Sequence, residues 1–193
     1  MQQLNFRPRA QAFDMFDCYN EVNSYGFYVF NAKKILEGLN EEILFSKEHP
    51  NYLPAEGLWP PYDGPTDDHR VIFERAAREL GQEYGFNKTK IHVCQYWSNG
   101  GSRIEKWHND ACENDGSYEF ALNCYFDDVV GDEGLLQYKP MDDKEDKCVH
   151  TYRPQKYDIA VLDHTKSFLH RITPTTQRRR VLVITGKVLA ECL

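Results

Sequence analysis

The feature that most constrains this fold is a series of short β-rich segments that fills the chain after Gly85. Clusters of Gly, Asn, Asp and Pro separate these segments, which read IHVCQYW, SYEFALNCYF, GLLQYKP, CVHTYRP, YDIAVLDH, SFLHRI and RRRVLVITGKV. β-Branched and aromatic residues favour strands, and turn-forming clusters end them. About seven or eight short strands preceded by helices predict a double-stranded β-helix (jelly-roll) barrel with helices packed on one outer face.

The first part of the chain is mixed. The segment Tyr25–Phe30 has strand composition and leads into a helical pattern, NAKKILEGLNEEILFSK, for which Asn31 suits the N-cap. A second helix is expected from Thr66 to near Gly85. At 193 residues the chain is long enough for one core. We therefore expect one mainly β domain with flanking helices (α+β) over residues 1–193, with helical support in 1–88 and a jelly-roll core in 89–188.

Composition and charge exclude several classes of protein. The 41% of hydrophobic and 13% of aromatic residues exclude a disordered chain, and apolar runs such as VLVIT are too short to span a membrane. The start, MQQLNFRPRA, lacks the apolar stretch of a signal peptide, so a soluble cytoplasmic protein is expected. The six cysteines contain no CxxC pair, which favours free thiols. A net charge of −7 disfavours nucleic acid as a partner.

One short motif, KWHND, carries a histidine and a carboxylate two residues apart. In an extended segment His108 and Asp110 point to the same side, so they are able to bind one ion together with a third ligand from elsewhere. Two histidines and one carboxylate suit Fe(II) that must also bind a cosubstrate and O₂. The segment after His170 is the informative one, because a strand containing Arg180 follows it. An arginine there is able to hold a dicarboxylate by its far end.

The ordered set of His108, Asp110, His170 and Arg180 resembles the Fe(II)/2-oxoglutarate-dependent dioxygenases, and most closely their prolyl 4-hydroxylase-like branch. The resemblance is collinear over residues 91–185. Its other supporting segments are Gln95–Tyr96 with Gly100–Gly101, Ala121–Leu122–Asn123, Gly134–Leu135–Leu136 with Tyr138 and Pro140, and Arg153–Pro154 with Asp158 and Ala160–Val161–Leu162.

The resemblance implies a complete site. His108, Asp110 and His170 would be the metal ligands and catalytic centre, and Arg180, Tyr96 and Asn123 would bind the cosubstrate 2-oxoglutarate. O₂ would be consumed, ascorbate would support turnover, and succinate and CO₂ would be released. The expected reaction is hydroxylation of an unactivated C–H bond in a peptidyl, prolyl-like residue or in a free amino acid or small metabolite. The carboxylate of Asp110 favours hydroxylation over halogenation, with desaturation or ring closure as less frequent outcomes.

Some positions depart from the family pattern. Ala121 occupies a position where the family often has a tyrosine that contacts 2-oxoglutarate, and Arg178 replaces a glycine in the turn before the arginine. Among the three consecutive arginines, the tenth residue after His170 fits the family best and selects Arg180, with Arg178 on the same face as the alternative. Substrate contacts are expected from three residues whose outward packing is equally compatible with the sequence: Trp107, Tyr125 and Gln137.

Alternative interpretations remain for the acidic loop and for the function. Asp127–Asp128 and Asp132–Glu133 suit either a solvated loop or a mobile lid for a cationic substrate. The protein is alternatively a non-catalytic jelly-roll module that binds a metal or ligand. A nucleic-acid demethylating dioxygenase is disfavoured by the acidic balance and by the lack of any arginine after Arg180. The sequence leaves the oligomeric state open.

Overall fold

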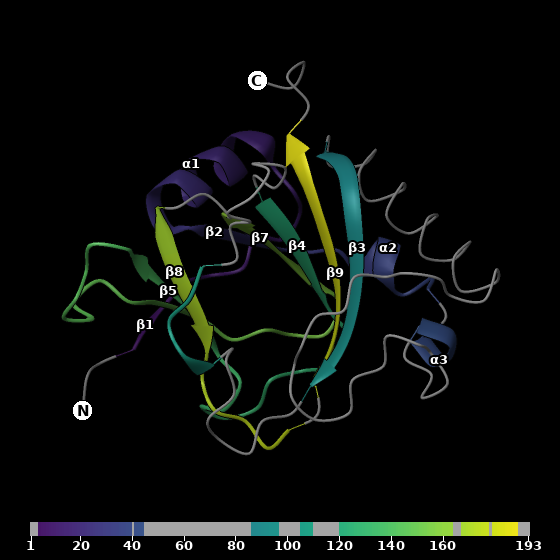
Figure 1. The fold of residues 1–193 in the computed structure, drawn as a ribbon. Helices are drawn as coiled ribbons and strands as arrows, with labels where there is room; N and C mark the ends of the chain where they lie inside the picture. The colour runs from purple at the N-terminus through teal and green to yellow at the C-terminus, as the bar shows by residue number, and fades with distance from the viewer. Residues whose placement is uncertain are drawn as a thin grey trace.

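The structure is a computed structural model that describes residues 4–39, 41–44, 86–96, 105–109, 120–163, 167–177 and 179–188. Two β-sheets face each other (Figure 1). The five-stranded sheet has the order β2-β7-β4-β9-β3 and the four-stranded sheet the order β1-β6-β5-β8. The strands are β1 (Asn5–Phe6), β2 (Phe27–Asn31), β3 (Phe86–Tyr96), β4 (Phe120–Tyr125), β5 (Leu136–Pro140), β6 (His150–Tyr152), β7 (Asp158–Asp163), β8 (Phe168–Ile172) and β9 (Arg179–Val188). This arrangement confirms the predicted jelly roll.

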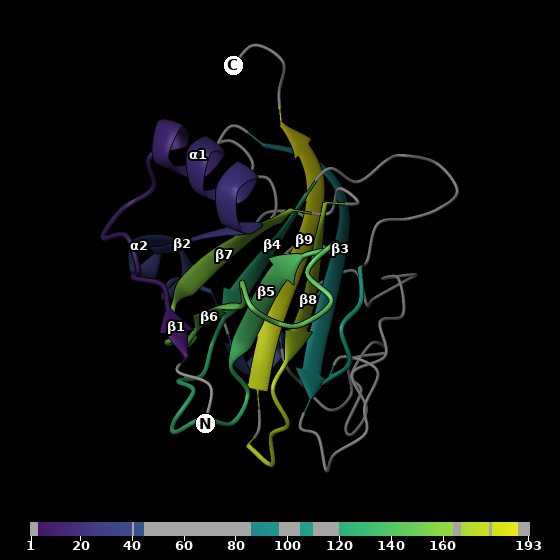
Figure 2. The same ribbon diagram turned by 90° about the vertical axis from the view of Figure 1, so that its left-hand side faces the viewer.

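The helices of the described ranges are α1 (Met15–Tyr25), α2 (Lys33–Leu36) and α3 (Glu41–Leu44). In the view of Figure 2 the two sheets appear as layers, and α1 lies beside β2 and β7. Within the described ranges no helix is both long and apolar enough to span a membrane.

Alternating side chains divide the interior into two apolar clusters. One cluster lies between the two sheets, and we call its side the inner face of each strand. It contains Phe27, Val29, Ala121, Tyr125, Leu136, Tyr138, Tyr152, Ala160, Leu162, Phe168, Ile172, Val181 and Val183. The other lies between the five-stranded sheet and the helices α1 and α2, on the outer face, and includes Cys18, Tyr28, Phe30, Leu36, Leu122, Cys124, Ile159, Val161 and Leu182. Because β2, β7 and β9 are covered on both faces, they carry apolar residues at consecutive positions.

The β-rich segments of the sequence all contain strands, whereas the helices differ from the prediction. The helix expected to begin at Asn31 forms as two short helices, α2 and α3, with Gly38 between them. Gly weakens a helix interior because of its backbone freedom, which explains the break. Asn31 ends β2, and its side chain accepts a hydrogen bond from the Lys33 amide at 3.3 Å. The helix expected from Thr66 to Gly85 lies outside the described residues.

The N-terminal region contributes more than helical support. β1 pairs with β6 and β2 pairs with β7, so the first 88 residues add a strand to each sheet. The helix α1, which the sequence pattern did not reveal, begins at Asp14, whose side chain accepts from the Asp17 amide at 2.9 Å. It ends at Gly26, which adopts φ 86°.

The cysteines whose side chains the structure describes are free thiols, as expected from their spacing. They are Cys18 and Cys124, which are buried, and Cys148, which is exposed. Burial raises the pKa of the Cys18 thiol to about 12, and the charge of Asp14 acts in the same direction.

Candidate metal centre

His108 and His170 lie side by side although they are distant in sequence. The amide of His108 donates to the His170 carbonyl at 3.0 Å, and the amide of His170 donates to the His108 carbonyl at 2.9 Å. This two-bond β-bridge joins the segment 105–109 to β8. The two imidazole centroids are 4.3 Å apart. The structure therefore brings together two of the three expected metal ligands.

The ring of His108 is oriented by its own chain. Its Nδ1 lies 2.7 Å from the carbonyl oxygen of Lys106. A carbonyl oxygen only accepts hydrogen bonds, so Nδ1 carries the proton and Nε2 is the basic nitrogen. A histidine that donates one ring N–H to a carbonyl while its other nitrogen binds the ion is the usual arrangement at protein metal sites.

His170 is buried against an aromatic side chain. The imidazole is 7% exposed, and it stacks on the ring of Tyr138 with 5.2 Å between centroids and an interplanar angle of 18°. Tyr138 lies directly opposite His170 in the pairing of β5 with β8. Both side chains are on the inner face. Sequence reasoning placed Tyr138 only as part of a strand motif and missed this contact.

The donor chemistry of the pair fits a divalent metal, because imidazole nitrogen is a common ligand of iron. Asp110, the expected carboxylate ligand, lies outside the described residues. No group of three His, Cys, Asp or Glu side chains able to hold a metal gathers within the ranges that the structure describes. Two imidazoles at this spacing, with the predicted carboxylate two residues further along the chain, are compatible with the expected ligand set.

The arginines of β9 point to opposite sides of the five-stranded sheet. Arg179 shares the inner face with Val181 and Val183, and it is 2% exposed. Arg180 shares the outer face with Leu182. Its guanidinium lies 2.7 Å from Asp127 and 3.0 Å from Glu41.

This geometry corrects the expectation for Arg180, which the spacing had directed into the barrel. Side chains alternate along a strand, so a shift of one residue exchanges the two faces. Arg179, the ninth residue after His170, is the one of the two that faces the barrel interior. Arg178 lies outside the described residues.

Two polar residues accompany Arg179 on the inner face. The guanidinium carbon of Arg179 lies 5.5 Å from the centre of the Tyr125 ring. Tyr125 is 2% exposed and Asn123 is 7% exposed, and both alternate with apolar residues of β4 that face outward. Burial raises the pKa of the Tyr125 hydroxyl, while the charge of Arg179 opposes that change. The expected cosubstrate residue Asn123 therefore lies on the same strand face as Tyr125, the expected substrate residue.

The backbone makes room for Arg179 at one glycine. Gly134 has φ 70°, and a Cβ added there would lie 3.2 Å from the Cδ of Arg179. Tyr96, the remaining expected cosubstrate residue, is opposite Arg179 in the pairing of β3 with β9. Its side chain lies outside the described part of the structure.

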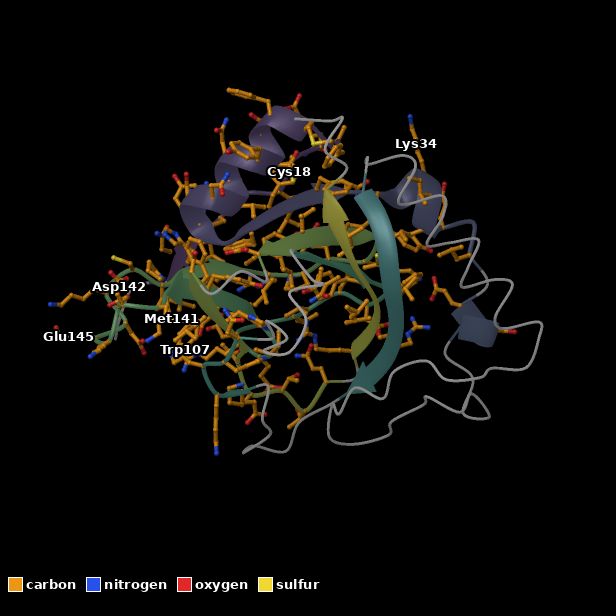
Figure 3. All side chains as sticks on the ribbon, turned by 45° about the horizontal axis from the view of Figure 1, so that its top comes forward. Cys18, Lys34, Trp107, Met141, Asp142 and Glu145 are labelled. Atoms are coloured by element: carbon orange, nitrogen blue, oxygen red, sulfur yellow. The ribbon has the colours of Figure 1, made fainter. Side chains whose placement is uncertain are left out.

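Trp107 and Gln137 do not face the barrel interior, contrary to the expectation that they contact substrate. Gln137 is on the outer face of the four-stranded sheet, where its Oε1 accepts from Arg171 Nε at 2.8 Å and its Nε2 donates to Thr151 Oγ1 at 3.3 Å. Trp107 covers the same face, and Figure 3 shows it near the connection from β5 to β6 that carries Met141, Asp142 and Glu145. The alternation of β5 sends Tyr138 inward and Gln137 outward.

The acidic loop after β4 is held by contacts to other segments. Asp127 binds Arg180, and Asp128 accepts from the Lys156 amide at 2.8 Å. Asp132 lies 3.2 Å from Arg153. Glu133 accepts from the amide and hydroxyl of Thr176, each at 3.0 Å. These contacts favour a structural role for the loop over a mobile lid.

Comparison with known proteins gives no match to any family profile and none to any curated sequence. Solved structures do match. A prolyl hydroxylase from Trichoplax adhaerens, in complex with a hypoxia inducible factor oxygen degradation domain peptide fragment, has a TM-score of 0.60 at 16% identity, covering 90% of this chain and 88% of that one. An oxidoreductase of the 2OG-Fe(II) oxygenase family from Burkholderia pseudomallei has a TM-score of 0.62 at 14% identity, covering 96% and 95%. A prolyl-4-hydroxylase from Pseudomonas putida has a TM-score of 0.54 at 12% identity, covering 94% and 97%.

At sequence identities of 12% to 16%, these matches show that the proteins share a fold. The likeness extends over 90% or more of the chain in each case. The chain thus has the jelly-roll fold of the prolyl hydroxylase and 2OG-Fe(II) oxygenase structures.

Proposed function

We propose that this protein is an Fe(II)- and 2-oxoglutarate-dependent oxygenase that hydroxylates an unactivated C–H bond. The observation that carries the proposal is the β-bridge that sets the imidazoles of His108 and His170 4.3 Å apart. The fold shared with 2OG-Fe(II) oxygenases supports it. The ordered sequence motifs support it independently of the fold.

The metal site would consist of His108, Asp110 and His170. The Nδ1–H of His108 donates to the Lys106 carbonyl, which directs Nε2 to the metal. Tyr138 fixes the plane of the His170 ring by stacking on it. Bound Fe(II) would supply the activation of O₂ that no amino-acid side chain provides. The role of the protein would be to hold both imidazoles in a fixed geometry before the metal binds.

Arg179 would hold the distal carboxylate of 2-oxoglutarate. Its guanidinium offers a planar set of donors that matches a carboxylate, and its burial between the sheets strengthens that attraction by excluding water. Tyr125 and Asn123 lie on the same face and would add a hydroxyl and an amide donor. Release of succinate and CO₂ accompanies this assignment as part of the proposal.

For the primary substrate we propose a peptidyl, prolyl-like residue, with a free amino acid or other small metabolite as the second candidate. The peptide fragment held by the Trichoplax adhaerens prolyl hydroxylase supports the peptide class. In either case the reacting C–H bond would have to approach the His108 and His170 pair.

The function is tested by measuring succinate release from 2-oxoglutarate with Fe(II), ascorbate and O₂, over a panel of prolyl peptides and free amino acids. We expect turnover that His108→Ala and His170→Ala abolish while both variants stay folded by circular dichroism. Wild-type protein that binds Fe(II) or 2-oxoglutarate but releases no succinate, with or without a substrate, would support the non-catalytic binding module instead.

A further inference from the structure

We propose that Trp107 is a positioning residue that holds His108 against His170 from the far side of the four-stranded sheet. The inference rests on the proposed metal site, because it assigns a purpose to the neighbour of a proposed ligand. Trp107 was expected to contact substrate, yet its ring lies outside the barrel on a set of charged side chains. We call this set the tryptophan clamp; it consists of Lys139, Asp146 and Arg171.

The clamp contacts the indole ring in three ways. The guanidinium carbon of Arg171 lies 4.3 Å from the ring centroid, and the ammonium of Lys139 lies 4.9 Å from it. Both distances are within the range of cation–π attraction. The indole N–H donates to Asp146 Oδ2 at 3.4 Å. The ring is therefore attracted through its π-system and also through its single donor.

Each cation of the clamp is itself held by other groups. Lys139 is 5% exposed, and its ammonium lies 2.5 Å from Asp146 Oδ1 and 2.7 Å from the Asp143 carbonyl. Arg171 donates to Gln137 at 2.8 Å. A surface lysine or arginine that contacts an aromatic ring must first give up side-chain freedom. Here the neighbouring contacts already restrict both side chains, so contact with the indole ring requires little further loss of freedom.

The clamp acts on the backbone next to the proposed ligand. Trp107 immediately precedes His108, whose amide and carbonyl form the bridge to His170. Asn109 adds a side-chain bond to the Phe168 carbonyl at 2.8 Å. Arg171 follows His170 on β8, so the residue that supports Trp107 is adjacent to the residue that pairs with His108. His108 and His170 therefore lie side by side on the inner side of the sheet. Trp107 and Arg171, which adjoin them in the chain, are in contact on the outer side.

Without the indole, the segment 105–109 is expected to keep this geometry in only a fraction of the molecules. The apparent dissociation constant for metal rises as the fraction of competent protein falls. Partners that orient metal ligands without touching the ion typically change metal affinity by about 10–100-fold. Trp107→Ala should therefore weaken Co(II) binding by about tenfold or more, while Trp107→Phe, which keeps an aromatic ring against the two cations, should weaken it about two- to threefold.

The experiment titrates Co(II) into the full chain under anaerobic conditions and follows the visible absorption of the bound ion. Phe6→Ala is the matched control, because the guanidinium of Arg153 lies 5.0 Å from the Phe6 ring at the other edge of the same sheet. We expect Phe6→Ala to bind Co(II) as the wild type does. Amide hydrogen exchange of residues 105–109 in metal-free protein is the second readout, and this segment should exchange faster in Trp107→Ala than in the wild type.

The outcomes separate this inference from the proposed function. If His108→Ala abolishes Co(II) binding while Trp107→Ala binds as tightly as the wild type and exchanges at the wild-type rate, the positioning role is wrong and the metal site stands. If Trp107→Ala accelerates exchange but neither His108→Ala nor His170→Ala affects Co(II) binding, the anchoring of the segment stands and the metal site is wrong. If Trp107→Ala and Phe6→Ala weaken binding equally, the effect is a general loss of stability, which overturns the inference.

Discussion

Arg179 and Arg180 are consecutive in β9, and their guanidinium groups lie on opposite faces of the five-stranded sheet. Arg179 is buried beside Tyr125 between the sheets, whereas Arg180 is bound to Asp127 and Glu41 on the side of the helices. The first is the arginine that we propose to bind 2-oxoglutarate. The second links α3 and the loop after β4 to β9 through these two ion pairs.

The two arginines should therefore respond differently to removal. Arg179→Ala should raise the dissociation constant for 2-oxoglutarate by about two orders of magnitude, since truncating one member of a buried charged pair costs about 2–5 kcal/mol. Isothermal titration with 2-oxoglutarate in the presence of Mn(II) measures this directly. Arg179→Lys should recover part of the affinity, because a lysine keeps the charge but loses the planar set of donors.

Arg180→Ala is the matched comparison. It should leave the affinity for 2-oxoglutarate within about threefold of the wild type, and it should lower the free energy of unfolding by about 1–3 kcal/mol because Asp127 and Glu41 lose their partner. Equal effects of both variants on 2-oxoglutarate affinity would contradict the assignment of the faces. A large effect of Arg180→Ala alone would restore the choice made from spacing.

The sequence predicted the strands better than it predicted which residues face inward. Each strand is bounded by turn-forming residues, and that signal is local. The inward face had to be read from alternation, yet Val181, Leu182 and Val183 are all apolar because both faces of β9 are covered. Three arginines precede them, so no polar and apolar alternation distinguishes Arg179 from Arg180. The register of β9 with β4, and of β4 with β7, supplied the missing information.

The position of Trp107 was beyond sequence reasoning for a different reason. Its contacts come from Lys139 on β5, Arg171 on β8 and Asp146 in the connection between β5 and β6. None of these is near Trp107 in the chain, and only the folded sheet brings them together. The pairing of His108 with His170, by contrast, was predictable because the order and spacing of the motif carry it.

Metal binding should stabilise the folded protein. A ligand that binds only the native state at one hundred times its dissociation constant adds about 2.7 kcal/mol, which for a chain of this size raises Tm by about 5–10 °C. We expect this shift with Co(II) in differential scanning fluorimetry, reversed by a chelator. His108→Ala and His170→Ala should each remove the shift. A chelator-insensitive Tm in the presence of excess Co(II) would contradict the site.

Gly26 follows α1 and lies against the ring of Tyr138, the residue that stacks on His170. It adopts φ 86°, and a Cβ added there would lie 2.6 Å from Tyr138 Cδ1 and 2.8 Å from Phe168 Cγ. Gly26→Ala should therefore lower the free energy of unfolding by about 2–4 kcal/mol, through backbone strain and the forced movement of Tyr138. Urea denaturation measures the loss, and the Co(II) titration should show weaker binding because the Tyr138 ring no longer fits against His170.

Gly131 provides the control for Gly26. It also adopts a positive φ, of 71°, but a Cβ added there would meet no atom within 4 Å. Gly131→Ala should cost about 1–2 kcal/mol from backbone strain alone and leave metal affinity unchanged. If the two variants are equally stable, the close approach of Tyr138 and Phe168 to Gly26 has no energetic weight.

The tryptophan clamp should also give a defined dependence of stability on pH. The hydrogen bond from Lys139 holds the pKa of Asp146 below its ordinary value of 3.8; partial burial opposes this shift, and the indole N–H of Trp107 supports it. For an acid whose folded-state pKa is lowered, the stabilisation is complete above the unfolded-state pKa and is lost as pH falls through the folded-state pKa.

Asp146 has φ 55°, a conformation that asparagine also tolerates, so Asp146→Asn removes the charge without adding strain. The variant should be less stable than the wild type from pH 5 to 7. The difference should begin to shrink below about pH 4, where the unfolded chain takes up a proton at this carboxylate, and should be lost as pH falls through the lowered folded-state pKa. Urea denaturation of both proteins from pH 7 to pH 3 measures it, with Glu145→Gln, in a solvated ion pair of the same connection, expected to change stability little at any pH. A difference between wild type and Asp146→Asn that stays constant to the lowest pH would mean that the charge of Asp146 does not stabilise the clamp.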